Sequence, residues 1–183
     1  MSDFIVLKSG PLILREININ DVTKKYVNWL NDPDVNQHLE SRFVLQNDST
    51  VKNFVEDCNK SKTVFLFGIF IEKNNKHIGN IKLGPINKYH NHAEIGLMIG
   101  DKSEWGKGYG SRAIFEVTNF AFNQLKISKV NAGCYESNTG SKKSFNKVGY
   151  KVEGVLKEHV VFNGHREDVL RFGCFPYSLN YHK

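Results

Sequence analysis

Three glycines at alternate positions form the part of this sequence whose residue types best suit ligand chemistry. They lie in the run Glu104-Trp105-Gly106-Lys107-Gly108-Tyr109-Gly110-Ser111, which leads directly into a segment with amphipathic helical spacing. Glycine lets the backbone approach a ligand closely, and the start of a helix presents unpaired N–H groups with about half a positive charge. This combination predicts a cradle of backbone amides for an anion, such as a phosphate or pyrophosphate.

Spacing alone leaves two interpretations of this run. Ser111 stands where the dinucleotide-binding pattern G-x-G-x-x-G needs its third glycine, and the P-loop order G-x-x-x-x-G-K-[ST] is absent. A glycine-rich turn that joins a strand to a helix explains the same residues without a ligand. The sequence that follows favours the phosphate site.

A second motif lies further along the chain. Asn138 and Ser141 form an N-x-x-S pair, which is followed by Lys147-Val148-Gly149-Tyr150. A strand-like run from Lys129 to Tyr135 separates this pair from the glycine turn. The order of glycine turn, helix, strand, N-x-x-S helix, K-x-G-Y and long hairpin resembles the GNAT superfamily of acetyl-CoA-dependent N-acetyltransferases. Within it, the chain is most similar to the branch with the ribosomal-protein alanine acetyltransferases and the spermidine acetyltransferases.

The resemblance covers nearly the whole chain and implies one acetyltransferase domain over residues 1–183. Periodicity and turn signals agree with an α+β fold. They predict a mixed α+β sheet. The resemblance implies that this sheet is mostly antiparallel, with about seven strands and helices on both faces, and that the cofactor lies in a splay between the fourth and fifth strands. The expected strands are 12–17, 64–72, 77–83, 92–99, 130–135, 152–162 and 166–175. The expected helices are 21–30, a short one toward Leu39, one that Ser49 caps, one after the glycine turn, and 138–148.

Composition narrows the class of protein and its partners. The 183 residues are 40% hydrophobic, which allows a sizeable core, and no apolar run approaches a membrane span. The three cysteines are scattered and odd in number, which indicates a reducing cytoplasm and no metal site. The net charge of +6 is dispersed, so it favours an anionic ligand or a solvated surface over nucleic acid. We expect a monomer or a homodimer.

The resemblance implies acetyl-CoA as co-substrate. The pantetheine arm is expected to bind the backbone of Leu97, Met98 and Ile99 like an added strand, with an N–H near Met98 polarising the acetyl oxygen. Asn138 is expected to bond the cofactor arm, to cap its helix, or both. The pyrophosphate is assigned to the amides of the glycine turn, with cofactor-binding residues Trp105, Gly106, Lys107, Gly108, Tyr109, Gly110 and Ser111.

The groups that would move protons are less clearly defined. Glu94 on the fourth strand is a catalytic candidate as proton acceptor, and an ion-paired structural glutamate is the alternative. His92 shares the face of Glu94 as a second base, a surface residue or a substrate contact. Many members of the superfamily place a tyrosine at the position of Phe145, which cannot donate a proton. The ribosomal-protein branch uses a serine, matched here by Ser141, and Tyr135 is a weaker candidate.

The acceptor amine is the least determined feature. In the first two helices and the loop after them, Trp29 could stack on a sugar or base, Glu40 could bind an ammonium group, and Arg42 could bind a phosphate. An amino-sugar nucleotide carries all of these groups and is the favoured substrate. Core packing is the alternative for Trp29. A protein N-terminus is also open, although Val160 replaces a glutamate that the ribosomal-protein branch often carries. Further alternatives are a polyamine, a non-catalytic acyl-CoA-binding module, and a nucleic-acid-binding domain suggested by the pI near 9.1 alone.

Overall fold

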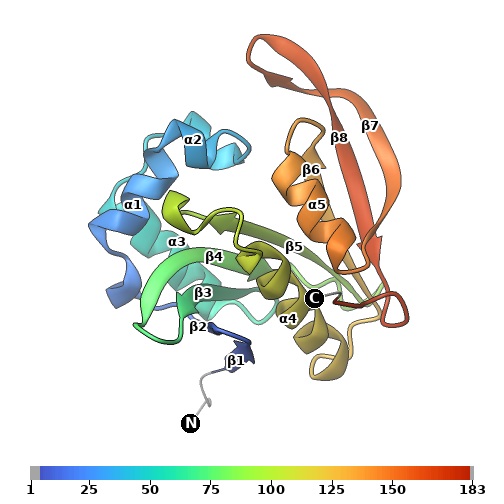
Figure 1. Cartoon of the computed structure of the whole chain (residues 1–183), viewed down its shortest axis with the longest axis horizontal. Helices are drawn as coiled ribbons and strands as arrows, with labels where there is room; N and C mark the ends of the chain where they lie inside the picture. The colour runs from blue at the N-terminus through green and yellow to red at the C-terminus, as the bar shows by residue number, and fades with distance from the viewer. Residues whose placement is uncertain (1–4, 182–183) are drawn as a thin grey trace.

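The chain folds around one mixed sheet with helices on both faces (Figure 1). The computed structural model describes residues 5–181, and within them eight strands lie in the order β1-β2-β3-β4-β5-β6-β8-β7. The strands are β1 Val6–Ser9, β2 Leu12–Glu16, β3 Phe65–Ile71, β4 Lys76–Leu83, β5 His92–Ile99, β6 Lys129–Tyr135, β7 Lys151–Phe162 and β8 His165–Cys174. The helices are α1 Lys24–Asn31, α2 Pro33–Asn36, α3 Asp48–Lys60, α4 Tyr109–Asn123 and α5 Thr139–Lys147.

The predicted α+β sheet is confirmed, with one strand more than expected. The additional strand is β1, which pairs with β2 across a turn at Gly10. The predicted fourth and fifth strands are therefore β5 and β6. The cap of α3 is also corrected: Asn47, and not Ser49, accepts a hydrogen bond from the Thr50 N–H at 3.0 Å. The Thr50 hydroxyl accepts from the Asn47 N–H in return, so the two residues form a capping box.

The two faces of the sheet carry separate cores. Neighbouring residues of β3 belong to different cores, because successive strand side chains point to opposite faces. Phe67 packs with α4 and α5, and Leu66 packs with α1 and α3. The apolar face that the sequence predicts for α4 is buried in the first core at Ile114, Val117 and Ala121.

A splay between β5 and β6 interrupts the sheet. The parallel pairing of these strands ends at Glu94 and Asn131; β5 then continues beside β4, and β6 continues beside β8. Glu94 and Gly100 turn their backbone toward β4, because the Glu94 carbonyl accepts from the Gly84 N–H at 2.7 Å and the Gly100 N–H donates to Ile78 O at 2.8 Å. Backbone direction alternates along a strand. The N–H and C=O groups of Leu97 and Ile99 therefore face the gap.

The closing hairpin is the long pair β7 and β8. Its turn residues Asn163 and Gly164 both have positive φ, at 49° and 81°. Positive φ at both central residues is what the predicted Asn-Gly turn requires. Among residues 5–181, the structure contains no helix that is long and apolar enough to span a membrane.

Candidate functional site

Two cavities meet where β5 and β6 separate. The larger, here called the glycine-turn cavity, has a volume of about 610 Å³ and is lined by the glycine turn, the end of β5 and the start of α5. The smaller, called the sheet cavity, measures about 250 Å³ and lies over β3, β4 and β5. The residues that line both cavities form the junction: His38, Leu39, Leu97, Met98, Asn138 and Ser141.

The glycine turn has the geometry of an anion cradle. Gly106 and Gly108 have φ of 75° and 78°, and a Cβ at either position would meet nothing within 4 Å. Gly108 is the N-cap of α4 and supplies no side-chain cap. Within the part of the chain that the structure describes, the backbone N–H groups of residues 106–111 have no hydrogen-bond acceptor. Unpaired N–H groups at a helix N-terminus favour a bound anion.

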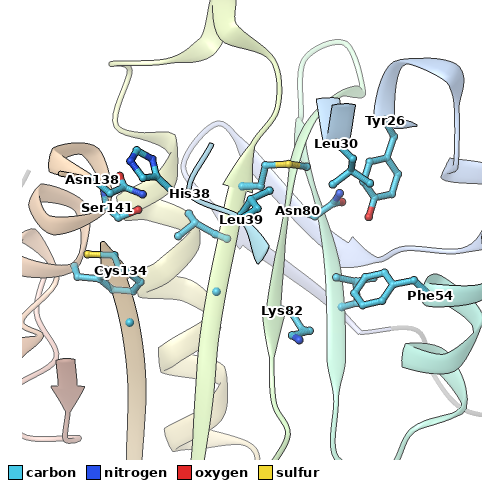
Figure 2. A pocket seen from close by; sticks show the side chains of 16 residues that line it. Tyr26, Leu30, His38, Leu39, Phe54, Asn80, Lys82, Cys134, Asn138 and Ser141 are labelled. Atoms are coloured by element: carbon cyan, nitrogen blue, oxygen red, sulfur yellow. Dashed lines mark hydrogen bonds between the residues drawn. The ribbon is translucent and has the colours of Figure 1, made fainter. Parts of the chain in front are cut away.

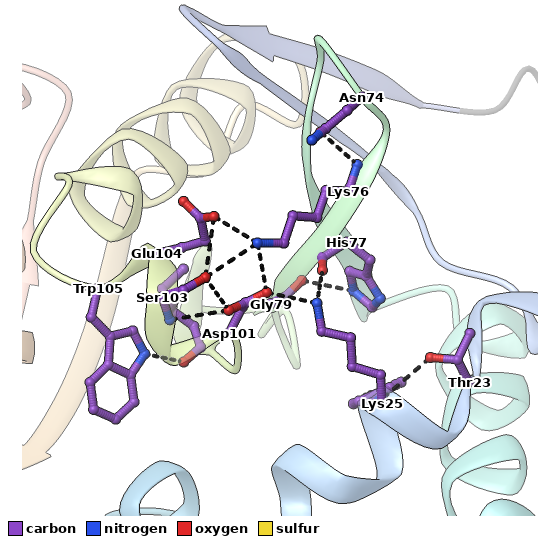
Figure 3. A network of polar contacts seen from close by, with 12 residues as sticks. Thr23, Lys25, Asn74, Lys76, His77, Gly79, Asp101, Ser103, Glu104 and Trp105 are labelled. Carbon is purple, nitrogen blue, oxygen red and sulfur yellow. Dashed lines mark hydrogen bonds and ion pairs between the residues drawn. The ribbon is translucent and has the colours of Figure 1, made fainter.

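A polar network fixes the segment that precedes the glycine turn (Figure 3). The Glu104 carboxylate pairs with Lys76 Nζ at 2.7 Å and with Lys107 Nζ at 2.8 Å. Asp101 pairs with Lys25 Nζ at 2.7 Å and with Lys76 Nζ at 3.0 Å. Hydrogen bonds from Lys107 and Lys76 lower the pKa of Glu104, so the carboxylate stays charged and keeps both lysines in place.

Most of the predicted cofactor residues line the glycine-turn cavity. Trp105 also donates its indole N–H to Ile99 O at 2.7 Å, which ties the turn to the end of β5. Lys107 and Ser111 are not among the lining residues, because Lys107 faces Glu104 and Ser111 is buried. The backbone N–H expected near Met98 is not that of Met98 itself, because Met98 turns its backbone toward β4. The N–H groups that face the gap are those of its neighbours Leu97 and Ile99. The lining members are Leu97, Met98, Ile99, Trp105, Gly106, Gly108, Tyr109, Gly110 and Asn138.

Ser141 reaches the junction from the first turn of α5. Asn138 is the N-cap of this helix, and its Oδ1 accepts from the Ser141 N–H at 3.0 Å. The Ser141 hydroxyl has no hydrogen-bond partner among residues 5–181 and is free to contact a ligand. Phe145 follows one turn later, is only 1% exposed, and packs on Tyr150 and Phe172. Its ring lines the sheet cavity without offering a donor.

His38 is a junction residue that sequence reasoning missed. Its Nε2 lies 3.1 Å from Ser137 Oγ, and its ring stacks on Phe162 at a centroid distance of 5.0 Å. Burial lowers the pKa of His38, so the imidazole is neutral and able to accept a proton near neutral pH. A lone histidine carries no spacing signal. Its contacts come from β7 and the loop before α5, both far away in the sequence.

The proton-transfer candidates on β5 and β6 lie outside both cavities. Glu94 Oε1 pairs with Arg171 Nη1 at 2.9 Å, and the two side chains are 48% and 40% exposed. The ring of His92 stacks on His90 beside Asn131. The Tyr135 hydroxyl donates to Glu40 and accepts from Arg42. The ion-paired alternative weighed for Glu94 is the arrangement in this structure.

The residues predicted for substrate binding are not brought together at either cavity. Trp29 is 6% exposed, and a Cβ on Gly100 would overlap its indole ring, so core packing is its role. Arg42 donates to Leu39 O and to the Tyr135 hydroxyl, and its side chain is mostly buried beside Glu40. Neither Trp29, Glu40, Arg42 nor His92 lines either cavity.

The sheet cavity has an apolar wall and a polar floor (Figure 2). Asn80 and Lys82 of β4 form the floor beside Met98 and Gly96 of β5, their cross-strand partners. No aspartate or glutamate of the described chain lines this cavity. Helices α1 and α3, strand β3 and the segment after α2 supply the wall, with Tyr26, Leu30, Leu39, Phe54 and Leu66.

Comparison with known families and curated proteins agrees with this geometry. A model of the acetyltransferase (GNAT) domain matches residues 11–151. The chain is 25% identical over 175 residues to the uncharacterized N-acetyltransferase p20 of Bacillus licheniformis, covering 91% of this chain and 93% of that protein.

Two solved structures share the fold at low sequence identity. One is a spermidine N-acetyltransferase from Vibrio cholerae in complex with CoA and spermine, with a TM-score of 0.82, 21% identity, and coverage of 92% of this chain and 97% of that one. The other is a ribosomal L7/L12 alpha-N-protein acetyltransferase in complex with coenzyme A, with a TM-score of 0.82, 18% identity, and coverage of 93% and 98%. Both confirm the predicted architecture.

Proposed function

The chain belongs to the acetyltransferase (GNAT) family, and we propose that it transfers an acetyl group from acetyl-CoA to the primary amine of a small molecule. The observation that carries this proposal is the junction, where the glycine-turn cavity and the sheet cavity share six lining residues. A donor held in one cavity and an amine held in the other would meet there. Holding both reactants at one point supplies much of the rate enhancement of a group transfer.

The residues present fit acetyl-CoA. The unpaired amides of residues 106–111 suit the pyrophosphate. The N–H and C=O of Leu97 and the N–H of Ile99, which face the gap, suit an extended arm. Asn138 lines both cavities at the end of that gap. When bound, acetyl-CoA supplies an activated thioester. The Leu97 N–H is the backbone donor at the junction that can polarise a carbonyl oxygen.

Two junction side chains can handle the protons. We assign His38 as the acceptor of the proton that the amine loses, because its imidazole is neutral and lines both cavities. Ser141 has a free hydroxyl that can donate a hydrogen bond to the departing sulfur. The N-x-x-S motif supports this proposal. Glu94 is paired with Arg171 outside the cavities, so we propose a structural role for it.

The sheet cavity favours a small acceptor over the alternatives. A volume of about 250 Å³ suits a compact amine. A polyamine needs anionic partners, and the described lining contains no carboxylate on this side of the junction. The prediction of an amino-sugar nucleotide depended on Trp29 and Arg42, and neither residue lines the sheet cavity or the glycine-turn cavity.

The proposal is tested by two measurements on the wild-type chain. Acetyl-CoA is expected to raise the melting temperature, because a ligand that binds only the folded state stabilises it. Release of free thiol from acetyl-CoA is expected to depend on an added amine. Stabilisation without thiol release from any amine would favour a non-catalytic acyl-CoA-binding module. Absence of both effects would refute the proposal.

A further inference from the structure

Asn80 presents an unused donor to the sheet cavity. Its side chain lies on the cavity floor, and the residue is 6% exposed (Figure 2). Among residues 5–181, its Nδ2 is the one side-chain nitrogen or oxygen atom that is itself fully buried and has no hydrogen-bond partner. Leaving a buried amide donor unpaired is costly, so such an atom at a cavity wall points to a ligand.

The orientation of this amide follows from its neighbour. His77 Nε2 lies 3.0 Å from Gly79 O and 3.0 Å from Asn80 Oδ1. A backbone carbonyl only accepts hydrogen bonds, so Nε2 of His77 must carry the hydrogen. Asn80 then uses Oδ1 as the acceptor, and both hydrogens of its Nδ2 remain. The His77 ring is held between Phe70, Tyr26 and Trp29, which fixes this arrangement.

Two further donors border the same cavity. Lys82 follows Asn80 on the same face of β4, and its Nζ forms no ion pair within the described chain. The Tyr26 hydroxyl has no hydrogen-bond partner among residues 5–181, and burial raises the pKa of Tyr26, so it stays protonated. The sheet cavity therefore offers an amide and an ammonium on its floor and a hydroxyl on its wall, and no carboxylate of residues 5–181 lines it.

We propose that the acceptor is a small primary amine that also carries an anionic oxygen group, a carboxylate or a phosphate, bound by Asn80 and Lys82. This inference rests on the proposed acetyltransferase function and names its substrate class. The anionic group would lie on the floor at β4, and the amine would extend toward His38 and Ser141 at the junction. Charge-assisted hydrogen bonds are stronger than neutral ones, so they would select this class over polycationic amines and over amines that lack an anionic group.

The test compares matched amines by kcat/KM for thiol release. One set contains an α-amino acid, its amide and the amine formed by its decarboxylation. A second set contains an amino-sugar phosphate and the free amino sugar. Spermidine is the polycationic amine. Amidation lowers the pKa of the amine, and decarboxylation raises it. The two compounds without a carboxylate therefore have amine pKa values on either side of that of the amino acid, which controls for the effect of amine basicity on the rate. We expect at least one anionic member to exceed its neutral counterparts by about tenfold or more, the ratio typical of one hydrogen bond to a charged group. The sets separate the carboxylate from the phosphate.

Asn80→Asp is the sharpest variant, because it keeps the acceptor for His77 and replaces the donor with a carboxylate oxygen that repels an anionic group. We expect it to lower kcat/KM for the anionic amine about tenfold while spermidine is used equally well or better. Lys82→Met should act in the same direction, and Lys88→Met, which removes a lysine from an exposed loop, should behave as wild type. Stabilisation by acetyl-CoA confirms that each variant is folded.

The two hypotheses fail in different ways. No thiol release with any amine and no stabilisation by acetyl-CoA would refute the acetyltransferase function. Two results would overturn the substrate class alone. One is thiol release that is as fast with spermidine, or with the amines that lack an anionic group, as with the anionic amines. The other is a ratio of kcat/KM between these amines that is unchanged in Asn80→Asp. Where turnover is slow, the affinities of the same amines for the complex with coenzyme A can be measured by calorimetry, and we expect the same order. An order led by an amine without an anionic group would also overturn the proposed substrate class.

Discussion

The two cavities that meet at the junction are built from different materials. The glycine-turn cavity is largely backbone: its donors are the amides of one continuous run, residues 106–111, and a network around Glu104 fixes that run. The sheet cavity is made largely of side chains from elements that are spread along the chain from α1 to α5. A single unpartnered amide, that of Asn80, marks its floor.

This difference explains how one fold serves many reactions. A backbone cradle depends on dihedral angles and not on side-chain identity, so the same ligand group can be bound by divergent sequences. A side-chain cavity changes with every substitution in its lining, so the acceptor can differ between relatives of the same fold. The comparison predicts that substitutions in the first cavity impair binding of acetyl-CoA, and that those in the second alter the use of the amine.

Gly108→Val should have the largest effect. Valine at a φ of 78° costs about 1–3 kcal/mol of strain, and its side chain would enter the space of the amide cradle. We expect the KM for acetyl-CoA to rise on the order of a hundredfold. Gly164→Val is the matched control, since Gly164 also has positive φ and open space but lies in the β7–β8 turn. An equal loss of acetyl-CoA affinity in both variants would contradict the role of the cradle.

His38→Gln should lower kcat about a hundredfold with little change in the KM for acetyl-CoA, because a positioned base contributes about this factor. The neutral imidazole is the active form, so activity is lost as the pH falls through the pKa of His38. Burial lowers that pKa below its ordinary value, and the acid limb of the wild-type profile should lie below about pH 6.5. The variant should lack this limb. An unchanged profile would exclude His38 as the proton acceptor.

Glu104→Gln should have an intermediate effect that is confined to the cofactor. Its loss weakens the contacts to Lys76 and Lys107 that hold the glycine turn in place. We expect the KM for acetyl-CoA to rise about fivefold and kcat to stay within about twofold, as is typical when a supporting contact is removed. Glu72→Gln, which breaks an exposed pair with Lys8, is the control and should change neither. A fall in kcat alone would place Glu104 in the chemistry.

Glu94→Gln should have the smallest effect. Its pair with Arg171 is exposed, and such pairs contribute about 0–1 kcal/mol to stability. We expect kcat to stay within about threefold of wild type and the melting temperature to change little. A loss of about a hundredfold in kcat would instead make Glu94 the proton acceptor, acting through a water.

The sequence predicts the glycine-turn cavity far better than the sheet cavity, for a physical reason. Glycine spacing and a helix start are local signals, and together they identify the run at Gly106 and Gly108. The Asn163-Gly164 turn is equally local. The environment of His38 depends on Phe162 and Ser137, and that of Asn80 depends on the cavity that it lines together with Tyr26 and Leu66. Contacts between distant segments leave no periodicity, so sequence reasoning selected Trp29 and Arg42 and passed over both His38 and Asn80.

The most direct test of the account is a crystal structure of the chain with coenzyme A. We expect the pyrophosphate on the backbone amides of residues 106–111, the arm in the gap between β5 and β6, and the thiol at the junction beside His38 and Ser141. A pyrophosphate bound elsewhere, or a thiol that does not reach the residues shared by the two cavities, would contradict it.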